Sequence, residues 1–257
     1  MPLEHLAGRD VFVARTGDAP DTLMLHCTLA RHEALLPLAQ ALGITATLTD
    51  LIGHGRSGDW NGQGDYQTAN MQAAAALCDR PTHLIGHSFG ATVALRLALD
   101  HPEKVNRLTL IEPVYFALAT DPVANADHRA RFEPINAAYA AGDLATAARL
   151  FHGDWGVGDW NAIPERTRNG FARRMPLIMA GVPAIQDDVF NVAGRLVELT
   201  VPVTLIRGAT SCLIMPAIHA GICAAVPHAR DHVVDGAGHM VPLTHVAQVA
   251  GIIAGAA

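Results

Sequence analysis

The sequence predicts an α/β fold in which a mostly parallel sheet is covered by helices on both faces. Three observations lead to this prediction. Short apolar runs alternate along the chain with segments whose apolar residues recur at helical spacing. The expected strands are apolar along their length, which is typical of parallel strands buried on both faces. The alternation is interrupted over residues 113–200, which indicates a helical insertion.

The regular part of the pattern runs from about residue 10 to residue 112. Strands are expected at residues 10–15, 22–27, 44–49, 82–87 and 106–112, and helices at residues 31–42, 67–79 and 89–100. The segment between the first two strands, residues 15–21, contains Gly, Asp and Pro and is expected to turn. The first helix has an apolar face and ends at Gly43.

Beyond residue 112 the pattern is helical but irregular, and prolines punctuate it. The alternation then resumes with a strand at 203–207, a helix at 215–225, a strand at 230–234 and a helix at 242–254. We therefore expect a core domain made of residues 1–112 and 201–257. Residues 113–200 are expected to form a helical cap that lies over the sheet.

The composition fits one large α/β domain with an insertion, and it argues against some partners. Half of the 257 residues are apolar and 16% are charged, which allows a sizeable core. The net charge of -6 provides no basic footprint for nucleic acid. The apolar runs are too short for a membrane span, and the first residues lack a signal-peptide pattern. Because the four cysteines are widely spaced, we expect free thiols in a cytoplasmic protein. We expect the protein to be a monomer or a homodimer.

The clearest functional signal is Gly86-His87-Ser88-Phe89-Gly90, which stands between an expected strand and an expected helix. A Gly-x-Ser-x-Gly motif in this setting is typical of a nucleophile elbow, because the glycines leave room for the sharp turn that exposes the serine. Of the three serines in the chain, only Ser88 has these flanks. We therefore predict Ser88 as a nucleophile. The N–H of Phe89, at the start of the helix, is predicted to stabilise a negative oxygen.

A nucleophilic serine needs a general base, and ligands of open parallel sheets bind outside the carboxyl ends of the strands. The last expected strand ends in Asp235-Gly236-Ala237-Gly238-His239. A histidine on such a glycine-rich loop can reach over the sheet to a serine. The chain has 14 histidines, and His239 is distinguished from the others by its position after Ser88 and after the candidate acid. We predict His239 as the base.

The histidine requires an anionic partner that holds its tautomer. The stretch after the strand at 203–207, where such an acid is usual, contains no carboxylate over residues 206–216. The strand at 106–112 ends in Glu112, which lies on the same rim of the expected sheet. We therefore predict Glu112 as the acid. A purely structural carboxylate is the alternative reading of Glu112, and Asp231 and Asp235 are weaker candidates for the acid.

The second donor for a negative oxygen is expected from the loop after the strand at 22–27, and we predict the N–H of Thr28. Helix capping is the alternative role for Thr28. Candidate substrate contacts are His26 in the same loop and Met240 after the predicted base. Three aromatic residues of the insertion complete the set of candidate substrate contacts: Phe116, Trp155 and Trp160. The alternative is that these three residues and Met175 form the core of the cap.

No metal or cofactor is expected. The pairs His83/His87 and His228/His232 are spaced by four residues, but both straddle expected strands, where this spacing does not define a helix face. The segment Gly53-His54-Gly55-Arg56-Ser57 lacks the Gly-Lys-Ser/Thr ending of a phosphate-binding loop. We interpret it as a structural turn near the site.

The whole chain resembles the α/β-hydrolases, a fold family that includes esterases, lipases, carbon–carbon bond hydrolases and lactonases. The resemblance rests on three segments in the family's order: residues 50–57, Gly86-His87-Ser88-Phe89-Gly90 and Gly236-Ala237-Gly238-His239. It implies an α/β-hydrolase fold with a cap between the sixth and seventh strands, which matches residues 113–200. A serine nucleophile argues against the epoxide hydrolases and haloalkane dehalogenases of this fold, which use aspartate.

Two positions depart from the family's pattern. Cys27 follows His26 where the family usually has a glycine, and Ser211 stands where the acid is common. Some members place the acid after the sixth strand, which is the position of Glu112.

These observations favour a serine hydrolase that cleaves a small carboxylic ester through an acyl-enzyme. Two alternatives remain at this stage. The same machinery could cleave a lactone, a thioester or a carbon–carbon bond, because fold and triad do not separate these reactions. The chain could also be a ligand-binding relative with weak activity, since its acid is absent from the common position.

Overall fold

The computed structural model describes residues 3–256, and within this range eight strands form one sheet in the order β1-β2-β4-β3-β5-β6-β7-β8. The pairs β1–β2 and β2–β4 are antiparallel, and all the other pairs are parallel. The strands are β1 (Leu3–Leu6), β2 (Arg9–Thr16), β3 (Thr22–Leu25), β4 (Ala46–Thr49), β5 (Thr82–His87), β6 (Val105–Ile111), β7 (Val203–Gly208) and β8 (Arg230–Val234). The predicted fold class is confirmed.

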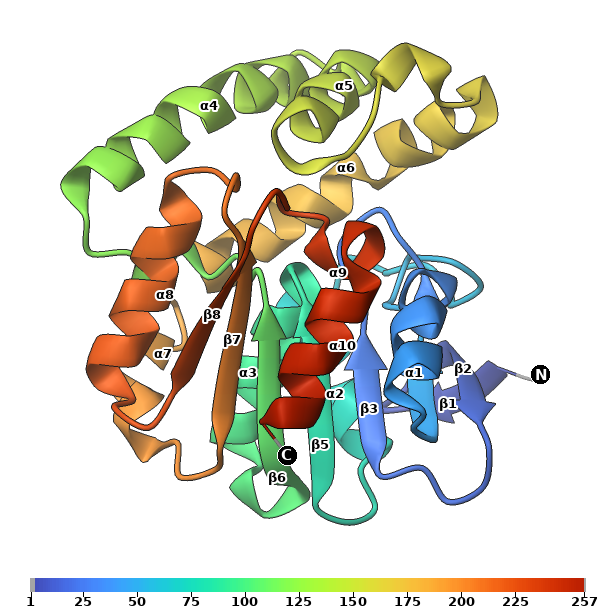
Figure 1. Cartoon of the computed structure of the whole chain (residues 1–257). Coiled ribbons are helices and arrows are strands. Elements are labelled where there is room, and N and C mark those ends of the chain that lie inside the picture. Colours follow the sequence, from blue (N-terminus) through green and yellow to red (C-terminus); the bar gives the residue numbers. More distant parts are fainter. Residues whose placement is uncertain (1–2, 257) are drawn as a thin grey trace.

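Helices cover both faces of the sheet, and Figure 1 shows α1 and α10 in front of it with α2 and α3 behind. Consecutive side chains of one strand point to opposite faces, so Leu84 packs in the apolar cluster with α2, α3 and α8, while Ile85 packs in the cluster with α1 and α10. This two-sided burial explains why apolar residues occur at consecutive positions in the central strands. The helices are η1 (His32–Leu35), α1 (Leu36–Leu42), α2 (Tyr66–Ala76), α3 (Phe89–Asp100), η2 (Pro102–Lys104), α8 (Ile214–Ala225), α9 (Val241–Thr244) and α10 (Val246–Gly255).

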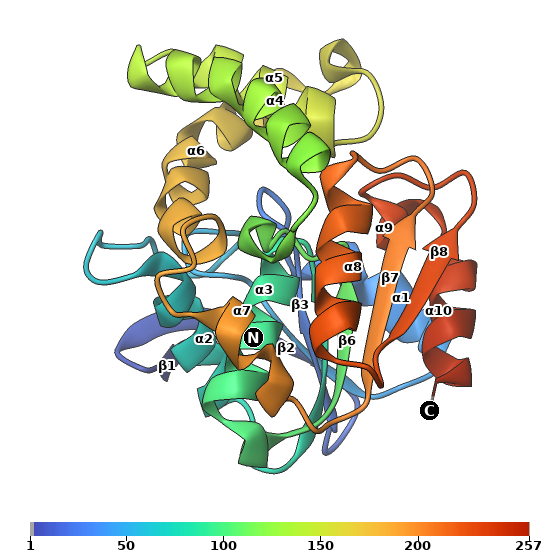
Figure 2. The ribbon, with the colours of Figure 1, turned by 90° about the vertical axis from the view of Figure 1, so that its left-hand side faces the viewer.

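The segment between β6 and β7 is helical and lies over the carboxyl ends of the parallel strands (Figures 1 and 2). Its elements are η3 (Phe116–Leu118), α4 (Pro122–Ala140), α5 (Leu144–Trp155), η4 (Trp160–Ala162), α6 (Glu165–Ile185), α7 (Val192–Arg195) and η5 (Leu196–Glu198). This insertion has an apolar cluster of its own, which includes Phe132, Ile135, Met175 and Ile178. The pairing of β6 with β7 is continuous from Leu108 to Ile111, so the insertion leaves and re-enters the sheet between neighbouring strands.

The two ends of the insertion are tied together at its base. The hydroxyl of Tyr115, just after β6, donates a hydrogen bond to Oδ1 of Asp188, just before α7, at 3.0 Å. The same carboxylate accepts from the backbone N–H groups of Val192 and Ala193 at the start of α7. Tyr115 is fully buried, so this contact is sheltered from water.

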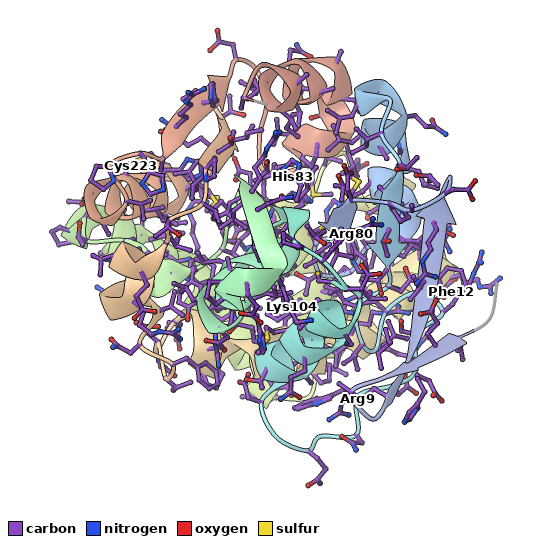
Figure 3. All side chains as sticks on the ribbon, turned by 90° about the horizontal axis from the view of Figure 1, so that it is seen from below. Arg9, Phe12, Arg80, His83, Lys104 and Cys223 are labelled. Atoms are coloured by element: carbon purple, nitrogen blue, oxygen red, sulfur yellow. The ribbon has the colours of Figure 1, made fainter. Side chains whose placement is uncertain are left out.

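The side of the molecule opposite the insertion is seen in Figure 3, where Lys104 and Arg80 are labelled. Lys104 Nζ donates to the carbonyls of Ala75 and Cys78, at the C-terminal end of α2. A cation at this position interacts favourably with the carbonyl groups at the end of a helix. This arrangement ties α2 to the segment that leads into β6. Among residues 3–256, no helix has the length and apolar character needed to cross a bilayer.

The structure differs from the sequence prediction in three places. The strand β1 was not predicted, because it is a short edge strand whose residues are exposed or half-buried. The expected helix at 242–254 is divided at His245, whose extended φ of -130° separates α9 from α10. The expected strand at 22–27 ends at Leu25, because the chain leaves the sheet there to form a loop at the rim.

Candidate active site

Ser88 lies at the corner where β5 passes directly into α3. Its φ of 55° and ψ of -120° are unfavourable for a residue with a side chain, and such strain costs on the order of 1–3 kcal/mol. The surrounding sheet holds the corner, because the N–H of Ser88 donates to the carbonyl of Ile111 at the end of β6 at 2.9 Å. The turn therefore carries the serine hydroxyl to the rim that the insertion covers.

The two glycines of the motif are required by close packing around the corner. A Cβ atom at Gly86 would lie 2.4 Å from Cα of Ala91, and one at Gly90 would lie 2.3 Å from the carbonyl oxygen of Leu25. Both neighbours are backbone atoms, which cannot rotate away as a side chain can. The first turn of α3 can pack against β3 and β5 at this distance only without these side chains.

We expect the substitution Gly86→Ala to destabilise the protein by about 1–3 kcal/mol, because the added methyl group overlaps the backbone of α3. Denaturant unfolding followed by circular dichroism measures this effect. Gly251→Ala is the matched control, since nothing lies within 4 Å of its added Cβ and Gly251 is an exposed residue of α10. The control is expected to gain about 0.5–1 kcal/mol from helix propensity. Equal stability of the two variants would contradict the packing argument.

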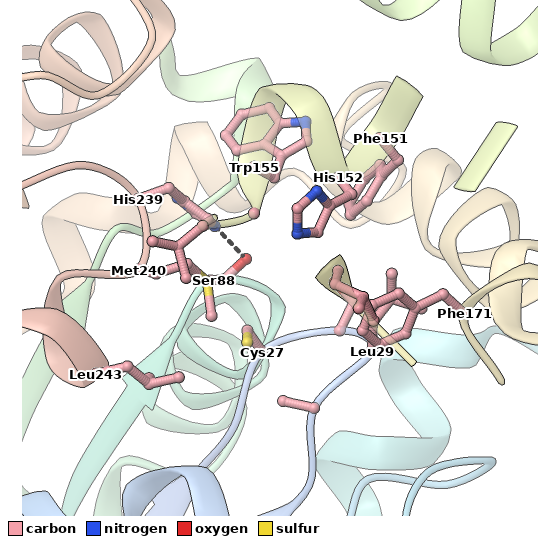
Figure 4. Close-up of a pocket in the computed structure, with 15 residues that line it drawn as sticks. Cys27, Leu29, Ser88, Phe151, His152, Trp155, Phe171, His239, Met240 and Leu243 are labelled. Atoms are coloured by element: carbon pink, nitrogen blue, oxygen red, sulfur yellow. Dashed lines mark hydrogen bonds between the residues drawn. The ribbon is translucent and has the colours of Figure 1, made fainter. Parts of the chain in front are cut away.

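Ser88, His239 and Glu112 form one chain of hydrogen bonds, and Figure 4 shows the first of them as a dashed line. Oγ of Ser88 lies 3.0 Å from Nε2 of His239, and Nδ1 of His239 lies 2.9 Å from Oε2 of Glu112. A carboxylate can only accept, so Nδ1–H donates to it and Nε2 is left free to accept the serine proton. All three residues are buried, at 4%, 7% and 0% exposure respectively.

The carboxylate of Glu112 is held by groups from the loop after β7. Its Oε1 accepts from the N–H of Gly208 at 2.7 Å and from Oγ–H of Ser211 at 2.6 Å. Burial alone would raise the pKa of Glu112, but the hydrogen bonds and charge of His239, Ser211 and Gly208 outweigh it and hold the pKa below its ordinary value. The group is therefore ionised at neutral pH.

No other carboxylate among residues 3–256 hydrogen-bonds His239. Asp231, the alternative considered from the sequence, instead accepts from Nδ1–H of His219 at 2.6 Å. The loop that carries His239 is held in turn by His87, whose Nε2–H donates to the carbonyl of His239 at 2.9 Å. Burial lowers the pKa of His87 to about 3, so its ring is neutral and serves as a hydrogen-bond donor here.

Thr28 and Phe89 line a small cavity together with Ser88. Phe89 is the first residue of α3, where N–H groups have no acceptor within the helix. Within residues 3–256, no backbone hydrogen bond of a turn or loop uses the N–H of Thr28. Thr28 does not cap the following helical segment, which begins after Arg31 without a side-chain cap. Both N–H groups are thus available beside the serine.

The sequence matches a known protein family. The model described as the Alpha/beta hydrolase family matches residues 23–252, which is most of the chain. The chain belongs to the α/β-hydrolase family.

Relatives of this α/β-hydrolase include esterases and lipases. Lipase LipV of Mycobacterium tuberculosis is 39% identical over 89 residues, which are 33% of this chain and 30% of the lipase. The pimeloyl-[acyl-carrier protein] methyl ester esterase of Aeromonas hydrophila is 26% identical over 255 residues, covering 95% of this chain and 97% of the relative. The structure of Est816, described as an N-acyl homoserine lactone degrading enzyme, superposes with a TM-score of 0.74 at 18% identity and 98% coverage of both chains. These relatives indicate an esterase-type hydrolase.

His26, a predicted substrate contact, does not line the two cavities beside Ser88. It is fully buried, its Nδ1–H donates to the carbonyl of Cys27 at 2.7 Å, and its Nε2 accepts from the N–H of Leu51 at 2.9 Å. Burial lowers the pKa of His26 to about 4, so the ring stays neutral. His54 has a similar role, since its Nε2 accepts from the N–H of Leu29 at 3.1 Å. The two histidines shape the rim loop, and the segment containing His54 is structural as expected.

The main cavity lies between the rim of the sheet and the insertion, and its volume is about 310 Å³. Ser88 and His239 are at its wall, and Trp155 and Met240, two predicted substrate contacts, also line it (Figure 4). The ring of Trp155 stands edge-on to the His239 ring, with 4.8 Å between the ring centres. The walls are almost entirely apolar, so the cavity suits an uncharged organic group.

Two of the expected aromatic contacts lie elsewhere. Phe116 lines the small cavity on the other side of Ser88, together with Phe89 and Val182. Trp160 lines neither cavity and packs behind their lining, with ring centres 5.4 Å from His152 and 6.2 Å from Phe171. The structure thus places Trp160 one layer behind the residues that line the cavities.

Several lining residues were not found from the sequence, and they come from the insertion and from the two rim loops. They are Cys27, Leu29, Phe151, His152, Val157, Ile163, Phe171 and Leu243. Gly208 and Ser211, which hold the carboxylate of Glu112, were also missed as site residues. The spacing of Phe151 and Trp155 on α5 marks one helix face, but the sequence does not show which surface that face meets.

One group of residues has the composition of a metal site. Ligand atoms of His32, Glu33 and Asp50 lie within 4.8 Å of one another. The carboxylate of Asp50, however, already accepts from the N–H and Nδ1–H of His32 and from the N–H of Arg56, at 2.7–2.8 Å. Burial alone would raise the pKa of Asp50, but these hydrogen bonds outweigh it and lower the pKa, so the group acts as an anionic anchor of the rim loops. We assign no metal to it.

Proposed function

We propose that this α/β-hydrolase cleaves small carboxylic esters through an acyl-enzyme formed on Ser88. The observation that carries the proposal is the continuous hydrogen-bond chain from Oγ of Ser88 through His239 to the ionised carboxylate of Glu112. This chain opens into an apolar cavity of about 310 Å³, which fits a small uncharged ester. The esterase relatives favour the same reaction.

The first half of the reaction forms the acyl-enzyme. Oγ of Ser88 attacks the ester carbonyl while its proton passes to Nε2 of His239. The negative oxygen of the tetrahedral intermediate accepts from the N–H groups of Thr28 and Phe89. His239 then returns the proton to the departing alcohol, and the carbon–oxygen bond to the alcohol breaks.

The second half repeats these steps with water as the nucleophile. Nε2 of His239 takes a proton from water, whose oxygen attacks the acyl carbonyl carbon. The collapse of the second intermediate releases the carboxylic acid and returns the proton to Oγ of Ser88. Throughout, the anion of Glu112 holds Nδ1–H and stabilises the imidazolium.

The test is covalent labelling by a fluorophosphonate, followed by peptide mass analysis. One label per chain on Ser88 is expected, because only an activated serine reacts at neutral pH. The same folded protein should hydrolyse p-nitrophenyl esters, and a series of acyl chain lengths would define its preferred acyl group. A folded protein that neither takes the label nor turns over any ester would instead be a ligand-binding member of the family.

We also infer that residues 113–200 act as a cap domain over the rest of the chain. Its own apolar cluster and the contact between Tyr115 and Asp188 at its base support a unit that folds as one piece. The residues that it adds to the main cavity, among them Phe151 and Trp155, assign it a role in substrate selection.

A further inference from the structure

His152 is the polar side chain that the insertion contributes to the main cavity. It lies on α5, is only 9% exposed, and its imidazole points into the space beside Ser88 (Figure 4). No side-chain hydrogen bond joins either ring nitrogen to another residue among residues 3–256, and neither nitrogen belongs to the fully enclosed side-chain atoms that lack a partner. The nitrogens of this nearly buried ring are therefore accessible from the cavity that it lines, where a ligand or water can complete them. The imidazole thus marks a position where a bound molecule can present a polar atom.

The protein makes specific room for this ring. A Cβ atom at Gly156 would lie 2.3 Å from Cδ2 and 2.5 Å from Nε2 of His152, so the ring can keep this position only with glycine at the end of α5. On other sides the ring packs against Trp160 and Phe171, with ring centres at 5.4 and 6.5 Å. These contacts hold the imidazole in one place while its nitrogens remain without a partner.

The position of His239 indicates which part of an ester lies near His152. His239 must deliver its proton to the departing alcohol, so the alcohol oxygen has to lie close to Nε2 of this imidazole. Ser88 and Thr28 line both cavities, whereas His239 and His152 line only the main cavity and Phe89 lines only the small one. The alcohol portion therefore extends into the main cavity, and the acyl portion is directed to the small one.

We propose that His152 is a specificity-determining residue, which hydrogen-bonds an uncharged oxygen in the alcohol portion of the ester. This inference rests on the proposed function. The substrate class is then an ester of a small acyl group with a mostly apolar alcohol that carries a hydroxyl or ether oxygen. The apolar walls exclude a charged group, because no cation or anion of the cavity wall would compensate for its burial.

The test compares esters that differ by one atom in the alcohol portion. Pentyl butyrate has an all-carbon chain, and 2-ethoxyethyl butyrate and 3-methoxypropyl butyrate replace one methylene group by oxygen at different positions. The readout is the ratio of kcat/KM for the better ether ester to kcat/KM for the pentyl ester. His152→Phe is expected to lower this ratio by roughly 3- to 10-fold, as for the loss of one hydrogen bond. Activity on pentyl butyrate should persist in this variant.

The matched control is His128→Phe, the same substitution elsewhere in the insertion. His128 is 5% exposed, stacks on Phe116 with ring centres 4.0 Å apart, and lines neither cavity. Its ratio should equal that of the unmodified protein. An unchanged ratio in His152→Phe, including the case where both esters slow equally, would overturn the proposal.

A second variant covers the case in which His152→Phe does not fold. Gly156→Ala keeps the imidazole but displaces it, so the ratio should fall in this variant as well, and an unchanged ratio with a displaced ring contradicts the proposal. Failure of the underlying ester hydrolysis is recognised separately, because the protein would then turn over neither ester and would not be labelled at Ser88.

Discussion

Replacing Ser88 with alanine is expected to lower kcat for ester hydrolysis by about 10,000-fold or more, without loss of the fold. The substitution removes the atom that forms the acyl-enzyme. Among the described residues, Nε2 of His239 hydrogen-bonds no other hydroxyl that could replace it. The residual rate would come from the N–H groups of Thr28 and Phe89, which can still polarise a bound ester. Steady-state kinetics with a p-nitrophenyl ester measures the loss.

The control for this variant is to show that it is folded like the parent protein. Its circular dichroism spectrum and its unfolding midpoint should match those of the parent, since among residues 3–256 the serine hydroxyl hydrogen-bonds only His239. Labelling by the fluorophosphonate should disappear along with turnover. A folded Ser88→Ala protein that retains several per cent of kcat would show that another residue is the nucleophile.

The substitution Glu112→Gln is expected to lower kcat by about 1,000- to 10,000-fold. The amide nearly matches the carboxylate in shape, so its oxygen can keep accepting from Gly208 and Ser211. It loses the negative charge, however, and its NH2 group favours a tautomer in which Nδ1 accepts and Nε2 carries the proton. That tautomer cannot take the proton of Ser88. Steady-state kinetics near neutral pH provides the measurement.

The chain offers a matched control in a second carboxylate–histidine pair. Asp231 accepts from Nδ1–H of His219 at 2.6 Å, outside both cavities. Asp231→Asn makes the same chemical change there and should leave kcat within about 2-fold of the parent, since neither residue touches the site. If Asp231→Asn reduced kcat more than Glu112→Gln did, the assignment of the acid would be wrong.

The sheet and its helices were predicted because burial on both faces leaves a strong pattern in the sequence. Strands such as β3 are buried at every position, and the helix after Ser88 begins and ends where the pattern does. The edge strand β1 escaped prediction for the opposite reason. Its four residues alternate between exposed and half-buried, so no apolar run distinguishes them from a loop.

The predicted site depended on position along the sheet as much as on motifs. Ser88 and His239 stand in recognisable glycine-rich settings, whereas Glu112 was inferred because parallel strands bring their carboxyl ends to one edge. The structure places its carboxylate 2.9 Å from Nδ1 of His239. Its backbone has a φ of 50°, a strained conformation that no feature of the sequence indicates.

The direction of individual side chains at the site is what the sequence does not predict. His26 and Cys27 are neighbours in the rim loop, yet His26 turns into the protein and Cys27 lines the cavity. In the insertion, helix α5 has apolar residues that serve two surfaces, one against its own cluster and one facing the cavity. Periodicity finds such faces but does not assign them, which is why His152 is not found from the sequence. Trp160 lies in η4, outside a periodic helix face, and packs behind the cavity lining.

The bond between Tyr115 and Asp188 has a consequence for how this fold can diversify. The pairing of β6 with β7 fixes the spacing of the two strands that flank the insertion, and this bond joins the two ends of the insertion beside them. We therefore expect that the helices between the two ends can be exchanged. An exchange of these helices between relatives that cuts just inside this pair would carry over a new selectivity and leave the chemistry of the sheet in place. A cut outside the pair would separate residues that contact each other next to Glu112. We expect such an exchange to impair both the selectivity and the chemistry.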